Sequence, residues 1–108
     1  KPSFQSDIFS LGILFFEIVT GRVPFDAKTP GEVGVLMLEN DVPSPKKFMP
    51  SIPNEIEEII LKSTSKDLNI RYKDAKEMRK DIEKVYNNKK LINKGHSLFA
   101  RIFGLSRD

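Results

Sequence analysis

The chain has 108 residues, which is enough for one small domain with a single hydrophobic core. Its hydrophobic fraction of 39% and charged fraction of 31% are typical of a soluble globular chain and exclude a disordered one, and the absence of cysteine excludes disulfides and thiolate metal sites. The net charge of +3 comes from residues 87–108, which contain five basic side chains and one acidic side chain. Because a nucleic-acid-binding face needs clustered basic residues on the fold itself, we expect none on the folded part.

The first predicted element is a helix over about residues 5–20. Ser6 or Asp7 can cap it, because a short polar side chain accepts hydrogen bonds from the free amides of a first turn. A helix that is apolar on all sides is expected to be buried on all sides. The other helices of a 108-residue chain can cover only part of this one, so the pattern predicts that further elements surround it. We therefore expect a piece of a larger lobe, with an exposed apolar surface over residues 8–19 through which the chain can self-associate. The apolar positions are Ile8, Phe9, Leu11, Ile13, Leu14, Phe15, Phe16, Ile18 and Val19.

Turn residues separate this helix from a second one. Gly21 suits a left-handed C-terminal cap, and Pro24 prevents the first helix from continuing. The second helix is predicted over about residues 31–39, with Pro30 near its first turn, where the missing amide costs nothing.

A proline-rich connector leads to the third helix. Residues 41–53 contain four prolines and show no hydrophobic period, so we expect a loop that Phe48 and Met49 anchor to the core. The third helix is predicted over about residues 54–65, and its acidic first turn suits the helix dipole. One face of it should be buried, formed by Ile56, Ile59, Ile60 and Ser63.

The fourth helix and a basic tail complete the chain. The helix is predicted over about residues 75–88, where apolar residues recur at helical spacing, and Asp74 with Glu77 forms a sequence pair typical of a capping box. Residues 89–108 form a basic linker or tail that includes a short amphipathic segment. This tail can act as a linker helix, or it can contact an acidic membrane surface or a neighbouring domain. Its apolar residues are Leu98, Phe99, Ile102, Phe103 and Leu105.

Two segments carry a family resemblance. Residues 6–25 read SDIFSLGILFFEIVTGRVPF, and residues 61–82 read LKSTSKDLNIRYKDAKEMRKDI. In this order and spacing they resemble the C-terminal part of the large lobe of eukaryotic-type (Hanks-type) serine/threonine protein kinases, most of all the bacterial and archaeal members. The resemblance covers about residues 1–86. Two positions depart from the family pattern: Leu68 replaces a proline, and Phe9 replaces a tryptophan or tyrosine.

The resemblance implies an all-α, protein-kinase-like large-lobe fragment over residues 1–88, with four main helices, followed by the tail of residues 89–108 with a short C-terminal tail helix. The parent would transfer the γ-phosphoryl group of ATP to serine or threonine hydroxyls of proteins with the help of Mg²⁺. This fragment would be the helical base that anchors the catalytic loop and the activation segment, and it would not be catalytic alone. Its partners would be the upstream remainder of the kinase domain and, through the parent, protein substrates.

The resemblance also assigns roles to single residues. Asp7 would lie buried at the helix start and bond backbone amides of the catalytic loop, and Gly12 would allow close packing. Arg71 would pair with a buried glutamate that ends the activation segment, a bidentate and directional contact, and would be orphaned or solvated in this chain. Glu17 lies where some kinases contact a substrate arginine, and residues 35–38 resemble a surface that docks substrates or regulators. Without the family, Asp7 is a helix cap and Arg71 is an exposed side chain in a polar turn.

No residue of this chain is assigned to catalysis, to a cofactor or to a metal. The H-R-D, D-F-G and A-P-E motifs, a glycine-rich phosphate loop and a G-x-S-x-G elbow are all missing from the sequence. His96 is the single histidine, and no cysteine or carboxylate cluster accompanies it. ATP and Mg²⁺ are therefore expected for the parent only.

Two other classes of function remain open. The parent could be a pseudokinase or kinase-like regulatory domain, or the chain could be an independent helical interaction domain with a coincidental pattern. No apolar run approaches the length needed to span a bilayer and no signal peptide is visible, so we expect a cytoplasmic location or the cytoplasmic side of a membrane-anchored parent. The substrate, the preference between serine and threonine, the regulatory signal and the oligomeric state do not follow from the sequence.

Overall fold

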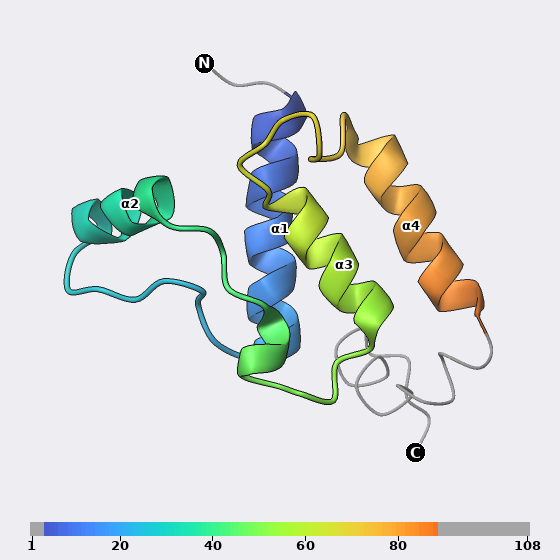
Figure 1. Ribbon diagram of the computed structural model, residues 1–108, viewed down its shortest axis with the longest axis horizontal. Helices are drawn as coiled ribbons and strands as arrows, with labels where there is room; N and C mark the ends of the chain where they lie inside the picture. Colours follow the sequence, from blue (N-terminus) through green and yellow to red (C-terminus); the bar gives the residue numbers. More distant parts are fainter. Residues whose placement is uncertain (1–3, 89–108) are drawn as a thin grey trace.

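The computed structural model describes residues 4–88 and is helical without strands over this range (Figure 1). The predicted all-α class and the predicted main helices are confirmed, with bounds within two residues of those expected. The predicted tail, with His96 and its apolar segment, lies outside the described residues. The elements are α1 (Phe4–Thr20), α2 (Pro30–Glu39), a 3-10 turn η1 (Pro45–Lys47), α3 (Asn54–Ser63) and α4 (Ala75–Asn87).

Three helices form the core: α3 packs against both α1 and α4, and α2 stands apart on the other side of α1 (Figure 1). The predicted apolar face of α3 is buried, and Ile60 and Ser63 on it are completely inaccessible to solvent. On α4, the helical spacing of the apolar residues buries Met78 and Val85. The buried hydrophobic side chains are Ile8, Phe15, Phe16, Val19, Val42, Ile52, Ile56, Ile59, Ile60, Tyr72, Met78 and Val85.

The connector between α2 and α3 is fixed to the core through aromatic packing. Phe48 packs edge-on against Phe16, with ring centroids 6.0 Å apart and an interplanar angle of 79°. The guanidinium of Arg22 lies 4.3 Å from the centroid of the Phe48 ring. The predicted anchoring by Phe48 and Met49 is therefore confirmed, because both pack against the core. The prediction that residues 41–53 form a loop throughout is wrong at Pro45–Lys47, which form the short 3-10 turn η1 with Ser44 as its N-cap.

α2 is held by its own cap more than by packing. The hydroxyl of Thr29 accepts a hydrogen bond from the amide of Glu32, and the carboxylate of Glu32 accepts one from the amide of Thr29. None of the α2 residues is buried, and the side chains of Val35 and Leu38 are 51% and 82% exposed. The ammonium of Lys66 donates to a carbonyl of α2 and ties this helix to the turn before α4. Within residues 4–88, α2 is thus an arm beside the core.

Helix ends differ from the prediction at two places. α1 begins at Phe4, so Ser6 and Asp7 lie inside its first turn, and the predicted capping by either residue is wrong. α3 ends at Ser63 rather than at residue 65. The hydroxyls of Ser63 and Thr64 both donate to the carbonyl of Ile60, at 3.0 and 2.7 Å, and side-chain bonds of this kind compete with the continuing helix.

The other predicted ends are confirmed. Gly21 has a φ of +73°, the left-handed conformation that a residue without Cβ adopts at low cost, and its amide bonds the carbonyl of Glu17. At α4, the carboxylate of Asp74 accepts a hydrogen bond of 2.9 Å from the amide of Glu77. The return bond differs from a strict capping box, because the Glu77 carboxylate accepts from the amide of Lys73 at 2.9 Å.

Candidate functional site

Arg71 is the centre of the candidate site. Its side chain is half-buried, and its Nε donates to the carbonyl of Ser65 at 2.8 Å while Nη1 donates to the carbonyl of Gln5 at 2.9 Å. The guanidinium also lies 5.0 Å from the centroid of the Phe9 ring. Burial lowers the pKa of Arg71 from its ordinary value, but an arginine remains charged at neutral pH. The expectation that Arg71 is orphaned or solvated in this chain is wrong, since carbonyl oxygens and an aromatic ring hold it.

The turn that carries Arg71 is built locally and then tied to α1. The Asp67 carbonyl accepts bonds from the amides of Ile70 and Arg71 at 2.9 and 3.0 Å, which closes the turn despite the leucine in the family's proline position. The side-chain amide of Gln5 donates to the carbonyl of Leu68 at 2.9 Å. The first turn of α1 and this turn therefore exchange hydrogen bonds in both directions, although 66 residues separate Gln5 from Arg71.

A cleft with a volume of ≈ 660 Å³ lies beside Arg71. Arg71 and Lys66 supply its positive charge, and Phe9 together with residues of α2 supplies its apolar walls. Among the residues that the structure describes, no acidic side chain lines this cleft. Two cations beside apolar walls suit a carboxylate that arrives with hydrophobic neighbours, and they offer neither a nucleophile nor a general base.

The other predicted site residues lie at different positions along α1. Asp7 is exposed in the first turn, so the expected buried acid is wrong for this chain, because no described segment covers that side of the helix. Gly12 faces α3, and an added Cβ would lie 2.6 Å from Cγ2 of Thr64. Glu17 is half-buried near the other end of α1. Neither acid forms an ion pair with Arg71 among the described residues.

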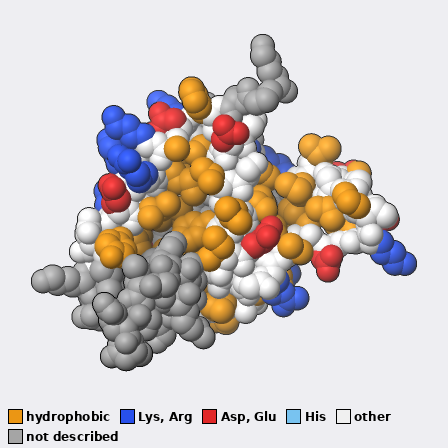
Figure 2. Space-filling view, turned by 180° about the vertical axis from the view of Figure 1, so that it is seen from behind, with side chains coloured by type: hydrophobic (Ala, Val, Ile, Leu, Met, Phe, Trp, Pro, Cys, Tyr) orange, Lys and Arg blue, Asp and Glu red, His pale blue; other side chains and the backbone are white. Residues whose placement is uncertain are grey.

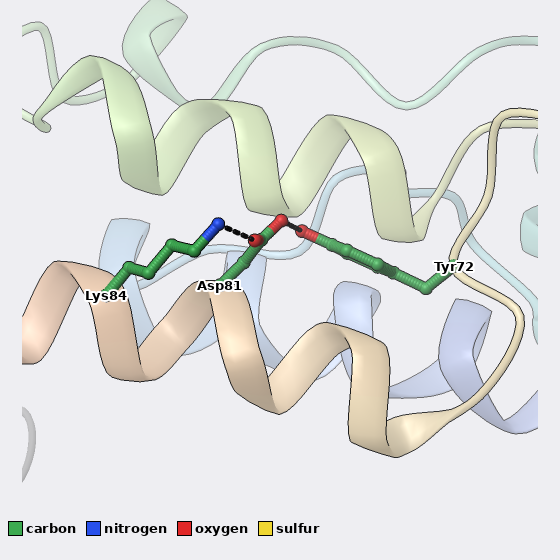
Figure 3. Close-up of polar contacts among 3 residues, drawn as sticks. All are labelled: Tyr72, Asp81 and Lys84. Carbon is green, nitrogen blue, oxygen red and sulfur yellow. Dashed lines mark hydrogen bonds and ion pairs between the residues drawn. The ribbon is translucent and has the colours of Figure 1, made fainter.

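A polar network around Tyr72 was not predicted. The Tyr72 side chain is only 1% exposed, and its hydroxyl donates to the Asp81 carboxylate at 2.7 Å (Figure 3). The ammonium of Lys84 lies 3.8 Å from the same carboxylate, and the Lys62 ammonium lies 4.5 Å from the centroid of the tyrosine ring. Burial, followed by the hydrogen bond to Asp81, raises the pKa of Tyr72 well above its ordinary value. The aromatic position after Arg71 was visible in the sequence, but no local pattern links it to an acid in the next helix.

The described residues supply positioning groups and no catalytic set. Within residues 4–88, no group of three or more His, Cys, Asp or Glu side chains is arranged to hold a metal ion. No helix in the same range is long and apolar enough to cross a membrane. The chemistry that the arrangement supports is therefore recognition of a carboxylate at Arg71 and rigid support of whatever contacts the first turn of α1.

Comparison with known proteins finds serine/threonine protein kinases of bacteria among the relatives of this chain. The serine/threonine-protein kinase PrkC of Bacillus subtilis is 41% identical over 90 residues, which are 83% of this chain and 14% of that protein. A probable serine/threonine-protein kinase PknB of Lactococcus lactis is 34% identical over 82 residues, 76% of this chain and 13% of that protein. The serine/threonine-protein kinase PknB of Mycobacterium tuberculosis is 31% identical over 83 residues, 77% of this chain and 13% of that protein. No protein-family model matches the chain. The chain thus spans about one seventh of the length of these relatives.

Proposed function

The chain belongs to the bacterial type of serine/threonine protein kinase and forms a segment of it, and on that premise we propose that the whole protein transfers the γ-phosphoryl group of ATP to serine or threonine hydroxyls of proteins. ATP and Mg²⁺ act in the parent, on residues outside this segment. A coincidental resemblance is no longer an alternative, because the match to the Bacillus subtilis kinase covers 83% of the chain at 41% identity. A pseudokinase remains the second candidate, since the residues that hold ATP and magnesium are not in this sequence.

The segment's own role in this proposal is to serve as the helical base of the large lobe. The observation that carries it is Arg71: a half-buried guanidinium held by two carbonyls, beside a cleft with cationic and apolar walls. A carboxylate at the end of the activation segment would complete this site. A bidentate arginine–carboxylate contact is directional, so it would fix the position of the segment that carries the acid.

Two acids of α1 take further roles in the proposal. Asp7 presents an exposed carboxylate on the first turn, next to the segment that Arg71 ties down, and it would accept hydrogen bonds from amides of the catalytic loop. Glu17 lies ten residues further, about 15 Å along the helix, and would contact a basic side chain of the substrate. The close contact of Gly12 with α3 would keep both acids on a rigid helix.

The apolar side chains that α1 leaves exposed need a cover. Leu11, Leu14 and Ile18 are 43%, 52% and 45% exposed, so the exposed apolar surface predicted over residues 8–19 is present on one side of the helix only. The other apolar residues of that range include the buried Ile8, Phe15, Phe16 and Val19. The remainder of the kinase domain would contact this helix in the parent, and self-association would cover it between isolated chains.

The proposed location is the cytoplasm or the cytoplasmic side of a membrane-anchored parent.

A chimeric kinase tests the proposed role. Residues 1–88 would replace the matching segment of Bacillus subtilis PrkC, and transfer of radioactive phosphate from ATP to a protein substrate would be measured. We expect the chimera to retain transfer, and Arg71→Met within it to lose at least about tenfold, because stranding one partner of a buried ion pair costs about 3–5 kcal/mol.

The control is Lys73→Met, an exposed cation two residues away in the same turn. Equal activity of the two variants, both folded by circular dichroism, would contradict the role of Arg71. A parent protein that binds ATP but transfers no phosphate would instead favour the pseudokinase.

A further inference from the structure

The position of α2 relative to the core depends on few contacts. None of the other described helices packs against α2, and none of its residues is buried. Figure 2, in which this arm projects to the right, shows hydrophobic side chains exposed on its surface. Lys66 supplies a contact from the core side, because its ammonium donates to the carbonyl of Met37. Lys66 is therefore placed to control where the end of α2 lies.

This contact caps the C-terminal end of α2. Met37 belongs to the last turn of the helix, where carbonyls lack a partner within the helix itself. The carbonyl of Leu36 accepts hydrogen bonds of 3.0 Å from the backbone amide and the side-chain amide of Asn40. The last turn contains no basic residue of its own, so the cation that favours the negative end of the helix dipole comes from Lys66.

Lys66 also lines the cleft beside Arg71. Both cations belong to one turn, and Arg71 bonds the carbonyl of Ser65, the residue directly before Lys66. A lysine ammonium has three donors and a guanidinium has five. Carbonyls of the described residues take one donor of Lys66 and two of Arg71. Each cation can therefore still donate to an acid that enters the cleft.

We propose that Lys66 is a positioning residue that couples α2 to the carboxylate at Arg71. This inference rests on the proposed function, in which the acid that ends the activation segment enters the cleft. The ammonium of Lys66 then bonds that carboxylate and the Met37 carbonyl at the same time. A charge-assisted bond to a carboxylate is stronger than a bond to a carbonyl, so it restrains the ammonium. Docking of the activation segment thus restrains the end of α2 through one side chain.

Hydrogen exchange in the full-length parent kinase tests this coupling and needs no phosphoryl transfer, so it applies to a pseudokinase as well. The glutamate that ends the activation segment is changed to glutamine, and exchange is followed at the amides of Leu38, Glu39 and Asn40. We expect their exchange rates to rise at least about fivefold, because the end of α2 loses a charge-assisted restraint. Amides of α3 around the fully buried Ile60 report any change in global stability.

Lys66→Met separates the coupling from a general loss of stability. The α2 amides of this variant should exchange faster from the start, and adding the glutamate change should raise their rates no further, as expected for two side chains in direct contact. Lys66→Arg should keep the response to the glutamate change, since a guanidinium can also donate to both acceptors. Lys73→Met, which removes an exposed cation of the same turn, should keep it too.

Three results would overturn the coupling: α2 exchange that does not respond to the glutamate change, additive effects of that change and Lys66→Met, or equal α2 exchange in Lys66→Met and Lys73→Met. The proposed function would survive each of these results, provided that Arg71→Met lowers transfer in the chimera. Full transfer by Arg71→Met would instead contradict the Arg71 site, and the coupling with it.

Discussion

Replacing Gly12 by alanine tests the contact that joins α1 to α3. An added Cβ would lie 2.6 Å from Cγ2 of Thr64 and 3.0 Å from Cβ of Ser63, and closer still to the Ser63 hydroxyl. Ser63 is fully buried, and its hydroxyl donates to the carbonyl of Ile60 at 3.0 Å. Rotating the hydroxyl away from the added methyl group would break this hydrogen bond inside the core.

The expected size of the effect follows from three contributions. Forcing an extra methyl group into a filled contact costs about 1–3 kcal/mol. A buried hydroxyl that loses its acceptor costs about 1–3 kcal/mol more, to the extent that it rotates. Alanine in place of glycine within a helix returns about 1 kcal/mol. We expect Gly12→Ala to lower the free energy of unfolding by about 2 kcal/mol.

Urea denaturation followed by far-UV circular dichroism measures this change. Gly34→Ala is the matched control, because Gly34 also lies in a helix and its added Cβ would meet no atom within 4 Å. The control should not lose stability. Combining Gly12→Ala with Ser63→Ala removes the closest atom, so the double variant should lose about 1 kcal/mol less than the sum of the single variants. A Gly12→Ala protein as stable as Gly34→Ala, or strict additivity of the pair, would refute the proposed clash.

Three further predictions concern side chains of the core and caps. Tyr72→Phe removes the bond to Asp81 and should lower the free energy of unfolding by about 1.5–3 kcal/mol. Because the pKa of Tyr72 is raised, the folded protein keeps a proton that the unfolded chain releases above about pH 10, so stability should fall with rising pH in that range, and less steeply in Tyr72→Phe; equal slopes in urea titrations would contradict the raised pKa. Asp74→Ala removes the cap of α4 and should cost about 1 kcal/mol in the same assay, against no comparable loss for the exposed Lys76→Ala. Ile60→Ala should cost about 2–5 kcal/mol, whereas Leu61→Ala, its partly exposed neighbour, should cost about 1 kcal/mol or less, and similar losses would be inconsistent with the burial of Ile60.

The helices could be predicted from the sequence because their signals are local. The left-handed Gly21, the cap at Asp74 and the apolar face of α3 each depend on residues within a few positions of one another. The kinase family could be predicted for a similar reason, since two continuous motifs in order carry it.

The contacts of the candidate site could not be predicted, because their partners are distant in the sequence. The acceptor of Arg71 on α1 lies 66 residues away, and the acid that Tyr72 bonds lies in the following helix. The burial of Asp7 was expected from the family and is absent here, since burial depends on the segment that covers a residue rather than on the residue itself. The early end of α3 depends on which way two hydroxyls turn.

The contact between Arg22 and Phe48 has a consequence for how this fold can vary. Arg22 and Phe48 lie on either side of residues 23–47, the segment that contains α2. The stacking of Arg22 on Phe48 and the packing of Phe48 on Phe16 hold both ends of this segment against the core. The entropic contribution to the free energy of closing such a loop rises by only about 0.6 kcal/mol for each doubling of the loop length. A change in the length of the arm should therefore cost little free energy and should leave the packing of α1, α3 and α4 unchanged.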